Sequence, residues 1–215
     1  MNKTCEAERE RIKNLWRYEN ELYGRGALHI AGVDEAGRGP LAGPVVAACV
    51  ILKQNDFLPG VDDSKKISEL KRGPLADMIK ARAVCYSIAE VGFDVIDRVN
   101  ILNATHEAMR RAISGMAIAP GHVLIDGLAV PDAGFTQTAI IKGDSLSLTI
   151  AAASIVAKVT RDEMMRGYHE IYPEYGFDQH KGYGTGKHIK AIRERGLCPI
   201  HRRSFSAKFA YQPQA

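Results

Sequence analysis

Four acidic residues of this chain stand where short apolar runs end. Asp34 and Glu35 follow the first such run, Asp126 follows a second, and Asp144 follows a third. Ionised carboxylates beside a core are costly unless they are paired or bind a metal. Four of them together would repel one another unless cations lay between them. No His or Cys accompanies them closely, so the ligands are oxygens, which favour Mg²⁺ or Mn²⁺ over Zn²⁺.

Each acid alone also has an ordinary structural explanation. Asp144, ahead of a predicted helix, could simply complement the helix dipole. Asp126, before Gly127, could be a turn residue, and an isolated Asp-Glu pair is most often a surface feature. Only the set of four favours a site. Two divalent ions about 3.5–4 Å apart within it would suit phosphoryl transfer on a nucleic acid.

Basic residues near the acids fit a phosphate backbone as partner. They are Arg38, Lys65, Lys66, Lys142, Lys181, Arg202 and Arg203. Such cations position a duplex without reading its sequence. Each alone is an ordinary solvated side chain, so only the grouping has weight. The net charge of +4 is compatible with a polyanionic partner but does not establish one.

Strands interleaved with helices are expected to position these residues. The stretch 30–52 predicts a hairpin with its acids at the lip, followed by the turn Gly37-Arg38-Gly39-Pro40. Further strands are predicted at 84–91, 122–127 and 137–142, and helices at 4–23, 68–82, 93–116, 145–172 and 186–195. This order indicates an α/β protein with a mixed sheet covered by helices. The acids would then meet at one edge of the sheet, where sites are usually built.

The adjacency of Asp34 and Glu35 raises a geometric conflict. Neighbouring residues on a regular strand point to opposite faces, so both cannot aim at one ion. We therefore predict that the strand ends or bulges at Glu35, with the following glycines allowing the bend. Unbroken pairing through Ala36 would count against Glu35 as a direct ligand.

Length and composition are those of an ordinary globular protein. The 215 residues are 46% hydrophobic and 25% charged, enough for one sizeable core. Four scattered cysteines without a Cys-x-x-Cys pair predict free thiols in a reducing compartment. No apolar run approaches about 18 residues, and the N-terminus lacks a signal-peptide core. We therefore expect a cytoplasmic protein that does not associate with a membrane. Nothing requires an oligomer, so a monomer is expected, and the tail 211–215 shows no clear docking motif.

The motifs resemble those of a known family. Residues 32–45, GVDEAGRGPLAGPV, are similar to the signature of bacterial ribonuclease HII. The resemblance continues through 63–66 (DSKK), 125–127 (IDG), 142–144 (KGD), 151–159 (AAASIVAKV), 172–173 (YP), 181–185 (KGYGT) and 201–205 (HRRSF). It covers about residues 28–209 in the same order, and its first motif is highly specific.

The resemblance implies a ribonuclease H-like fold and an endoribonuclease. The catalytic domain would span 27–215, including a C-terminal helical part that binds substrate, after a helical extension at 1–26. The enzyme would cut the RNA strand of RNA–DNA hybrids and also cut 5′ of single ribonucleotides in duplex DNA. Two Mn²⁺ or Mg²⁺ ions would serve catalysis, and the products would carry 5′-phosphate and 3′-hydroxyl ends.

The resemblance also assigns roles to residues. Asp34, Glu35 and Asp126 correspond to metal ligands, and Asp144 completes the catalytic set. The turn Gly37-Arg38-Gly39 would contact the ribonucleotide, because glycines allow close backbone approach and the 2′-hydroxyl distinguishes RNA from DNA. The other expected substrate-binding residues are Lys65, Lys66 and a tyrosine stacking on a sugar, best matched by Tyr172 and next by Tyr183. Without the resemblance, Tyr172 could equally be helix-end packing.

Two other functions use the same residues differently. A hybrid-binding module with a degenerate site would bind without cutting, but it would have no reason to keep the electrostatic cost of four intact acids. A metal phosphatase for small esters would use the acids and leave the basic tail and Tyr172 without a role. Competition by duplex nucleic acid separates these possibilities.

Overall fold

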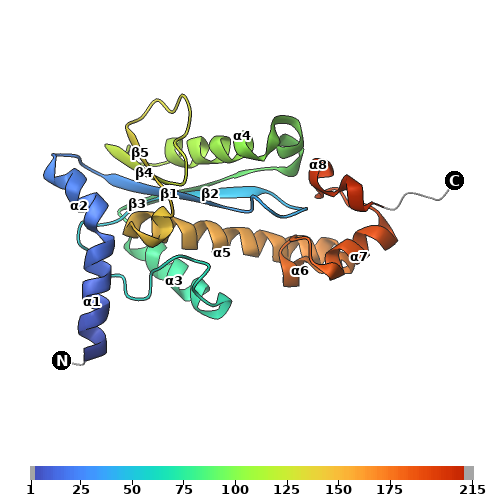
Figure 1. Ribbon diagram of the computed structural model, residues 1–215, viewed down its shortest axis with the longest axis horizontal. Helices are drawn as coiled ribbons and strands as arrows, with labels where there is room; N and C mark the ends of the chain where they lie inside the picture. Colours follow the sequence, from blue (N-terminus) through green and yellow to red (C-terminus); the bar gives the residue numbers. More distant parts are fainter. Residues whose placement is uncertain (1–2, 211–215) are drawn as a thin grey trace.

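A mixed five-stranded sheet forms the centre of the structure, a computed structural model that describes residues 3–210 (Figure 1). The tail 211–215 lies outside the described residues. The sheet order is β3-β2-β1-β4-β5. The strands are β1 (Ile30–Ala36), β2 (Val45–Ile51), β3 (Cys85–Val91), β4 (His122–Asp126) and β5 (Gln137–Ile140). Pairing is antiparallel between β1, β2 and β3 and parallel between β1, β4 and β5, which confirms the predicted α/β class.

Helices cover both faces of the sheet. In Figure 1, α4 (Phe93–Ser114) lies on one side, and α5 (Leu148–Ile171) and α3 (Glu69–Arg82) lie on the other. Helix α5 lies directly against β1 because Gly32 has no side chain: a Cβ there would be 2.1 Å from the Thr149 carbonyl carbon. As predicted, α5 is central, and residues 148–157 are all buried.

Two predicted helices are interrupted. The helix expected over 4–23 is α1 (Lys3–Leu15) followed by α2 (Arg17–Gly24), with the break at Trp16. The buried Trp16 indole donates a hydrogen bond to the Asp56 carbonyl at 2.9 Å. Helix α4 is kinked at Asn100, which has a φ of 68°, and the Asn100 side chain accepts a hydrogen bond from the Asn103 amide.

Short helices complete the chain beyond the far end of α5. They are η2 (Pro173–Tyr175), α6 (Phe177–His180), α7 (Gly186–Arg195), α8 (Arg203–Ser206) and η3 (Ala207–Phe209), while η1 (Gly143–Ser145) precedes α5. Figure 1 shows this C-terminal group at the opposite end of the molecule from α1. Across residues 3–210, no helix is both long and apolar enough to span a membrane.

Candidate metal centre and the adjoining glycine turn

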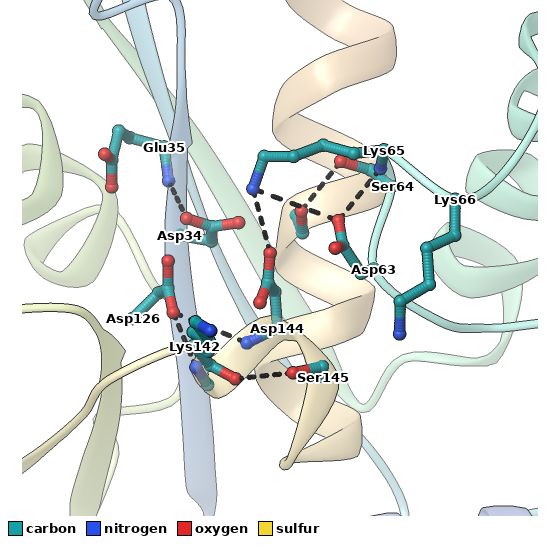
Figure 2. Close-up of polar contacts among 12 residues, drawn as sticks. Asp34, Glu35, Asp63, Ser64, Lys65, Lys66, Asp126, Lys142, Asp144 and Ser145 are labelled. Carbon is teal, nitrogen blue, oxygen red and sulfur yellow. Dashed lines mark hydrogen bonds and ion pairs between the residues drawn. The ribbon is translucent and has the colours of Figure 1, made fainter.

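Three carboxylates converge at the edge of the sheet. Asp34 near the end of β1, Asp126 at the end of β4 and Asp144 in η1 each offer an oxygen, and these oxygens lie within 4.8 Å of one another. They come together because β1 and β4 are parallel neighbours in register, with Val33 beside Ile125. Figure 2 shows the three side chains pointing toward one another.

Hydrogen bonds hold these acids in place. Asp126 Oδ1 accepts from the Gly143 amide at 2.6 Å, which ties β4 to η1. Lys142, in the left-handed conformation with a φ of 58°, turns the chain into η1. On the other side Asp34 Oδ1 accepts from the Glu35 amide at 2.7 Å. Ser154 of α5, whose hydroxyl lies 2.9 Å from the Ser64 hydroxyl, lowers the pKa of Asp34.

The charges of the acids oppose one another. Burial raises the pKa of Asp34 well above its usual range, and the nearby Glu35 and Asp126 raise it further. Burial and then Asp144 likewise raise the pKa of Asp126. Lys65 contributes a positive charge, with its Nζ 3.0 Å from Asp144 Oδ2. The raised pKa values mean that these carboxylates resist ionisation when no cation is bound. An all-oxygen donor set of this kind fits a hard divalent cation, which would neutralise the carboxylates.

The position of Glu35 differs from the expectation. Pairing of β1 with β2 is regular through Ala36, so the predicted break or bulge at Glu35 is wrong. Alternation along the strand therefore turns Glu35 away from the three-carboxylate cluster, and its Oε1 lies 3.4 Å from Arg38 Nη1. This regular geometry counts against Glu35 as a direct ligand, and Glu35 is not one of the three converging carboxylates. Burial raises the pKa of Glu35, and among its charged neighbours Arg38 lowers the pKa while Asp126 raises it.

A cleft of about 200 Å³ joins the acids to the glycine turn. Of the predicted residues, Asp34, Glu35, Gly37, Arg38, Gly39, Lys65 and Asp126 line it. Tyr183 also lines it and is 44% exposed, with its ring beside Gly39. Tyr172 does not line it and packs instead in the cluster around Phe177. Lys66 is also outside, paired with Asp62 at 3.1 Å.

Several residues of the cleft were not predicted. Ser154, Lys158 and Arg161 of α5 line it. Their spacing of four and three residues places them on one face of a helix that is otherwise largely apolar. That polar stripe is the sequence signal that could have identified these three residues as part of the site. Lys158 Nζ lies 2.6 Å from Asp162, which Arg72 also contacts at 3.1 Å.

Comparison of the sequence with known proteins identifies a family. A family model described as ribonuclease HII matches residues 31–208. Ribonuclease HII of Clostridioides difficile strain 630 is 52% identical over 198 residues, covering 92% of this chain and 78% of that protein. Ribonuclease HII of Caldanaerobacter subterraneus subsp. tengcongensis is 52% identical over 203 residues, covering 94% and 84%.

Solved structures are similar over most of the chain. Ribonuclease H2 from Pyrococcus horikoshii OT3 has a TM-score of 0.71 at 28% identity, covering 84% of this chain and 96% of that one. The RNase HII in a complex with PCNA from Archaeoglobus fulgidus has a TM-score of 0.69 at 27% identity, covering 81% and 94%.

Proposed function

This chain belongs to the ribonuclease HII family and is an endonuclease of RNA–DNA hybrids, and we propose that it also cuts 5′ of single ribonucleotides embedded in duplex DNA. The family membership confirms the resemblance seen in the motifs, and the solved relatives confirm the ribonuclease H-like fold. The observation that carries the finer proposal is that Asp34 and Asp126, which converge with Asp144, share one cleft with the glycine turn.

The charge relations of the acids support two ion positions. Asp34, Asp126 and Asp144 form one group. The charge of Glu35 also interacts with the charges of Asp34 and Asp126. Asp34, Asp126 and Glu35 would therefore form a second group, which shares Asp34 and Asp126 with the first. In this proposal Glu35 serves the second position, which does not require it to face Asp144. Two bound Mn²⁺ or Mg²⁺ ions would activate water and stabilise the leaving oxygen, giving 5′-phosphate and 3′-hydroxyl ends.

The remaining cleft residues would hold the substrate. The amides of the glycine turn would contact the ribonucleotide, and Lys65 would contact a phosphate. We assign the stacking role to Tyr183 in place of Tyr172, because Tyr183 lines the cleft. Lys66, outside the cleft, would contact the duplex further away. We further propose that residues 27–215 form a single catalytic domain after the helical extension 1–26, and that the protein acts as a monomer.

A duplex with one embedded ribonucleotide tests this function. The wild-type protein is expected to nick it 5′ of the ribonucleotide when Mn²⁺ or Mg²⁺ is present and to stop when a chelator is added. Asp126→Asn should lower the rate by more than about 100-fold, because losing even an outer partner of a metal ligand costs about 10–100-fold. Duplex binding should largely remain, since phosphate contacts lie elsewhere.

Asp77→Asn is the matched control, because Asp77 is an exposed acid on α3. It should cut like the wild type. Absence of a metal-dependent nick in the wild type would contradict the proposed function. Undiminished turnover in Asp126→Asn would instead show that the metal site is misassigned.

A further inference from the structure

Two buried arginines bind carbonyl oxygens of the glycine turn and of the residues that follow it. Arg202 is fully buried, and its guanidinium donates hydrogen bonds to five carbonyls at 2.6–3.1 Å. Those carbonyls belong to Gly37, Arg38, Pro40, Gly43 and Pro44. Arg161, 1% exposed, donates to the carbonyls of Ala42, Pro44 and Lys181 at 3.0–3.1 Å.

Among the described residues, no acid forms an ion pair with either guanidinium. The carboxylate next to Arg161 in sequence, Asp162, is bound by Lys158 and Arg72. Asp97, near Arg202, accepts from the backbone amides of Arg203 and Ser204. Burying a cation without a counter-ion is costly, and here carbonyl dipoles carry the compensation. Of residues 37–44 only Arg38 and Gly39 are exposed, so the two guanidiniums also provide partners for buried carbonyls while Arg38 and Gly39 face solvent.

Peptide geometry shows which backbone amides Arg202 orients. In a trans peptide the carbonyl and the following amide point in opposite directions, and the described chain has no cis bond. The carbonyls of Gly37 and Arg38 point inward to Arg202, so the amides of Arg38 and Gly39 point away from it. Within residues 3–210 neither amide donates to another group. Both residues line the cleft beside the acids.

Arg161 also packs against the turn. Gly37 has a φ of +99°, and a Cβ there would lie 2.1 Å from Arg161 Nε. The glycine is therefore required both for its backbone conformation and for contact with a buried cation. A guanidinium that binds several carbonyls also polarises the peptide groups, which strengthens their amides as donors.

The segment that carries Arg202 is itself bound to the turn. The Gly43 amide donates to the Ile200 carbonyl at 2.9 Å, and the Arg202 amide donates to the Leu41 carbonyl at 2.9 Å. Ala42 and His201 form an isolated β-bridge. The C-terminal part thus places one guanidinium at a fixed position behind residues 37–44.

We propose that Arg202, assisted by Arg161, is a positioning residue for ribonucleotide selection. It holds the amides of Arg38 and Gly39 toward the cleft, where they donate to the 2′-oxygen of the ribonucleotide. A deoxynucleotide lacks that acceptor, so the fixed amides favour the ribonucleotide. The inference rests on the proposed function, and it adds a residue outside direct substrate contact that sets selectivity.

The experiment compares binding of two duplexes by a protein that cannot cut. In an Asp34→Asn background with Mg²⁺, we would measure Kd for a duplex with one ribonucleotide and for the same duplex in all-deoxy form. Adding Arg202→Gln is expected to lower the preference for the ribonucleotide duplex by roughly tenfold, which corresponds to about 1.4 kcal/mol. The Kd of the all-deoxy duplex should stay within about twofold.

A purely structural role would leave the preference unchanged, because loss of folded protein lowers the active concentration equally for both duplexes. Arg193→Gln is the matched control: it removes the same charge from an exposed arginine of α7 and should keep the preference. Arg202→Lys keeps the charge, but an ammonium group lacks the planar set of five donors that a guanidinium has. This variant should therefore also lose preference for the ribonucleotide duplex. It serves as the test if Arg202→Gln does not fold.

Two results would overturn the inference. One is an unchanged preference in whichever Arg202 variant folds, and the other is equal binding of both duplexes by the Asp34→Asn protein. Failure of the wild type to nick the ribonucleotide duplex would instead overturn the proposed function, so the two failures are distinguishable.

Discussion

Tyr172 and Tyr183 both belong to the C-terminal part of the chain, but their surroundings differ. Tyr183 follows Lys181 and Gly182, which have φ values of 51° and 84°, and this left-handed pair brings its ring beside Gly39. Tyr172 caps α5 and packs against the apolar cluster around Phe177. We therefore propose that Tyr183 stacks on a sugar or base and that Tyr172 stabilises the fold.

Substitution of each tyrosine should separate these roles. Stacking contacts on nucleic acids contribute about 1–3 kcal/mol. Tyr183→Ala should therefore lower kcat/KM on a single-ribonucleotide duplex by roughly 5–150-fold, with little change in unfolding free energy, while Tyr183→Phe keeps most activity. Tyr172→Ala should instead lower the unfolding free energy by about 1–2 kcal/mol and leave kcat/KM nearly unchanged. A larger activity loss for Tyr172→Ala than for Tyr183→Ala, measured by cleavage and urea titration, would reverse the assignment.

At the scale of single residues, the sequence identified the site residues whose role follows from their type and from their place at a strand end. Asp34, Asp126 and Asp144 were predicted to meet because each follows a buried strand. The tyrosine could not be assigned in the same way, since its location depends on the backbone path of a loop. Arg202 appeared only as one basic residue near the acids, because burial of a cation against distant carbonyls has no local sequence signal.

Elements were predicted where their periodicity was strong and missed where a single contact decides the backbone. The hairpin, the strands and α5 are confirmed. The breaks at Trp16 and Asn100 depend on one indole hydrogen bond and one left-handed residue, which apolar periodicity does not reveal. The bulge predicted at Glu35 is absent because the cross-strand pairs Glu35–Ala47 and Ala36–Val46 continue the ladder.

Helix α2 is attached to the start of α5 by one buried acid. Glu19 Oε1 accepts from the Ser147 hydroxyl at 2.7 Å and from the Thr149 amide at 2.9 Å, at the end of the helix where anions are favoured. Among the described residues, Glu19 Oε2 has no hydrogen-bond partner. Burial raises the pKa of Glu19. This contact fixes the N-terminal extension just beyond Asp144.

Glu19→Ala should destabilise the protein by about 2–3 kcal/mol, because the Ser147 and Thr149 donors would be left buried without an acceptor. Glu19→Gln retains an acceptor oxygen and removes the buried charge, so its unfolding free energy should stay within about 1 kcal/mol of the wild type at pH 7. Urea denaturation of both variants measures the difference. Equal destabilisation by Ala and Gln would mean that charge, not hydrogen bonding, holds α2 in place.

Across the whole molecule, the glycine turn depends on a segment more than 150 residues away in sequence. Arg202 reaches Gly37 across 165 positions, and a group of buried histidines supports the surrounding loops. His188 and His201 share a hydrogen bond at 3.0 Å between their Nε2 atoms, and His188 Nδ1 lies 2.9 Å from the Tyr183 carbonyl. These contacts join the Tyr183 loop to the segment that carries Arg202. Such long-range contacts are invisible to local sequence patterns.

The histidine pair predicts how the stability of the whole molecule depends on pH. Burial lowers the pKa of both His188 and His201 to about 4, whereas an unfolded histidine titrates near about 6.5. Because the unfolded state binds these protons at higher pH, the stability that the neutral pair provides is present above about pH 6.5. It is lost progressively as pH falls toward 4. Each histidine should therefore lower the unfolding free energy by roughly 1–2 kcal/mol between pH 7 and pH 5.

Urea midpoints at pH 7 and pH 5 test this dependence. His188→Gln should be less stable than the wild type at pH 7, because the pair is broken, but should lose less stability on going to pH 5. His29→Gln, at an exposed position, should keep the wild-type dependence on pH. Because both histidines stay neutral in the folded protein down to about pH 4, the preference of the wild type for a ribonucleotide duplex should stay the same between pH 7 and pH 5. A wild-type midpoint that stays constant from pH 7 to pH 5 would show that the pair does not stay neutral in the folded protein.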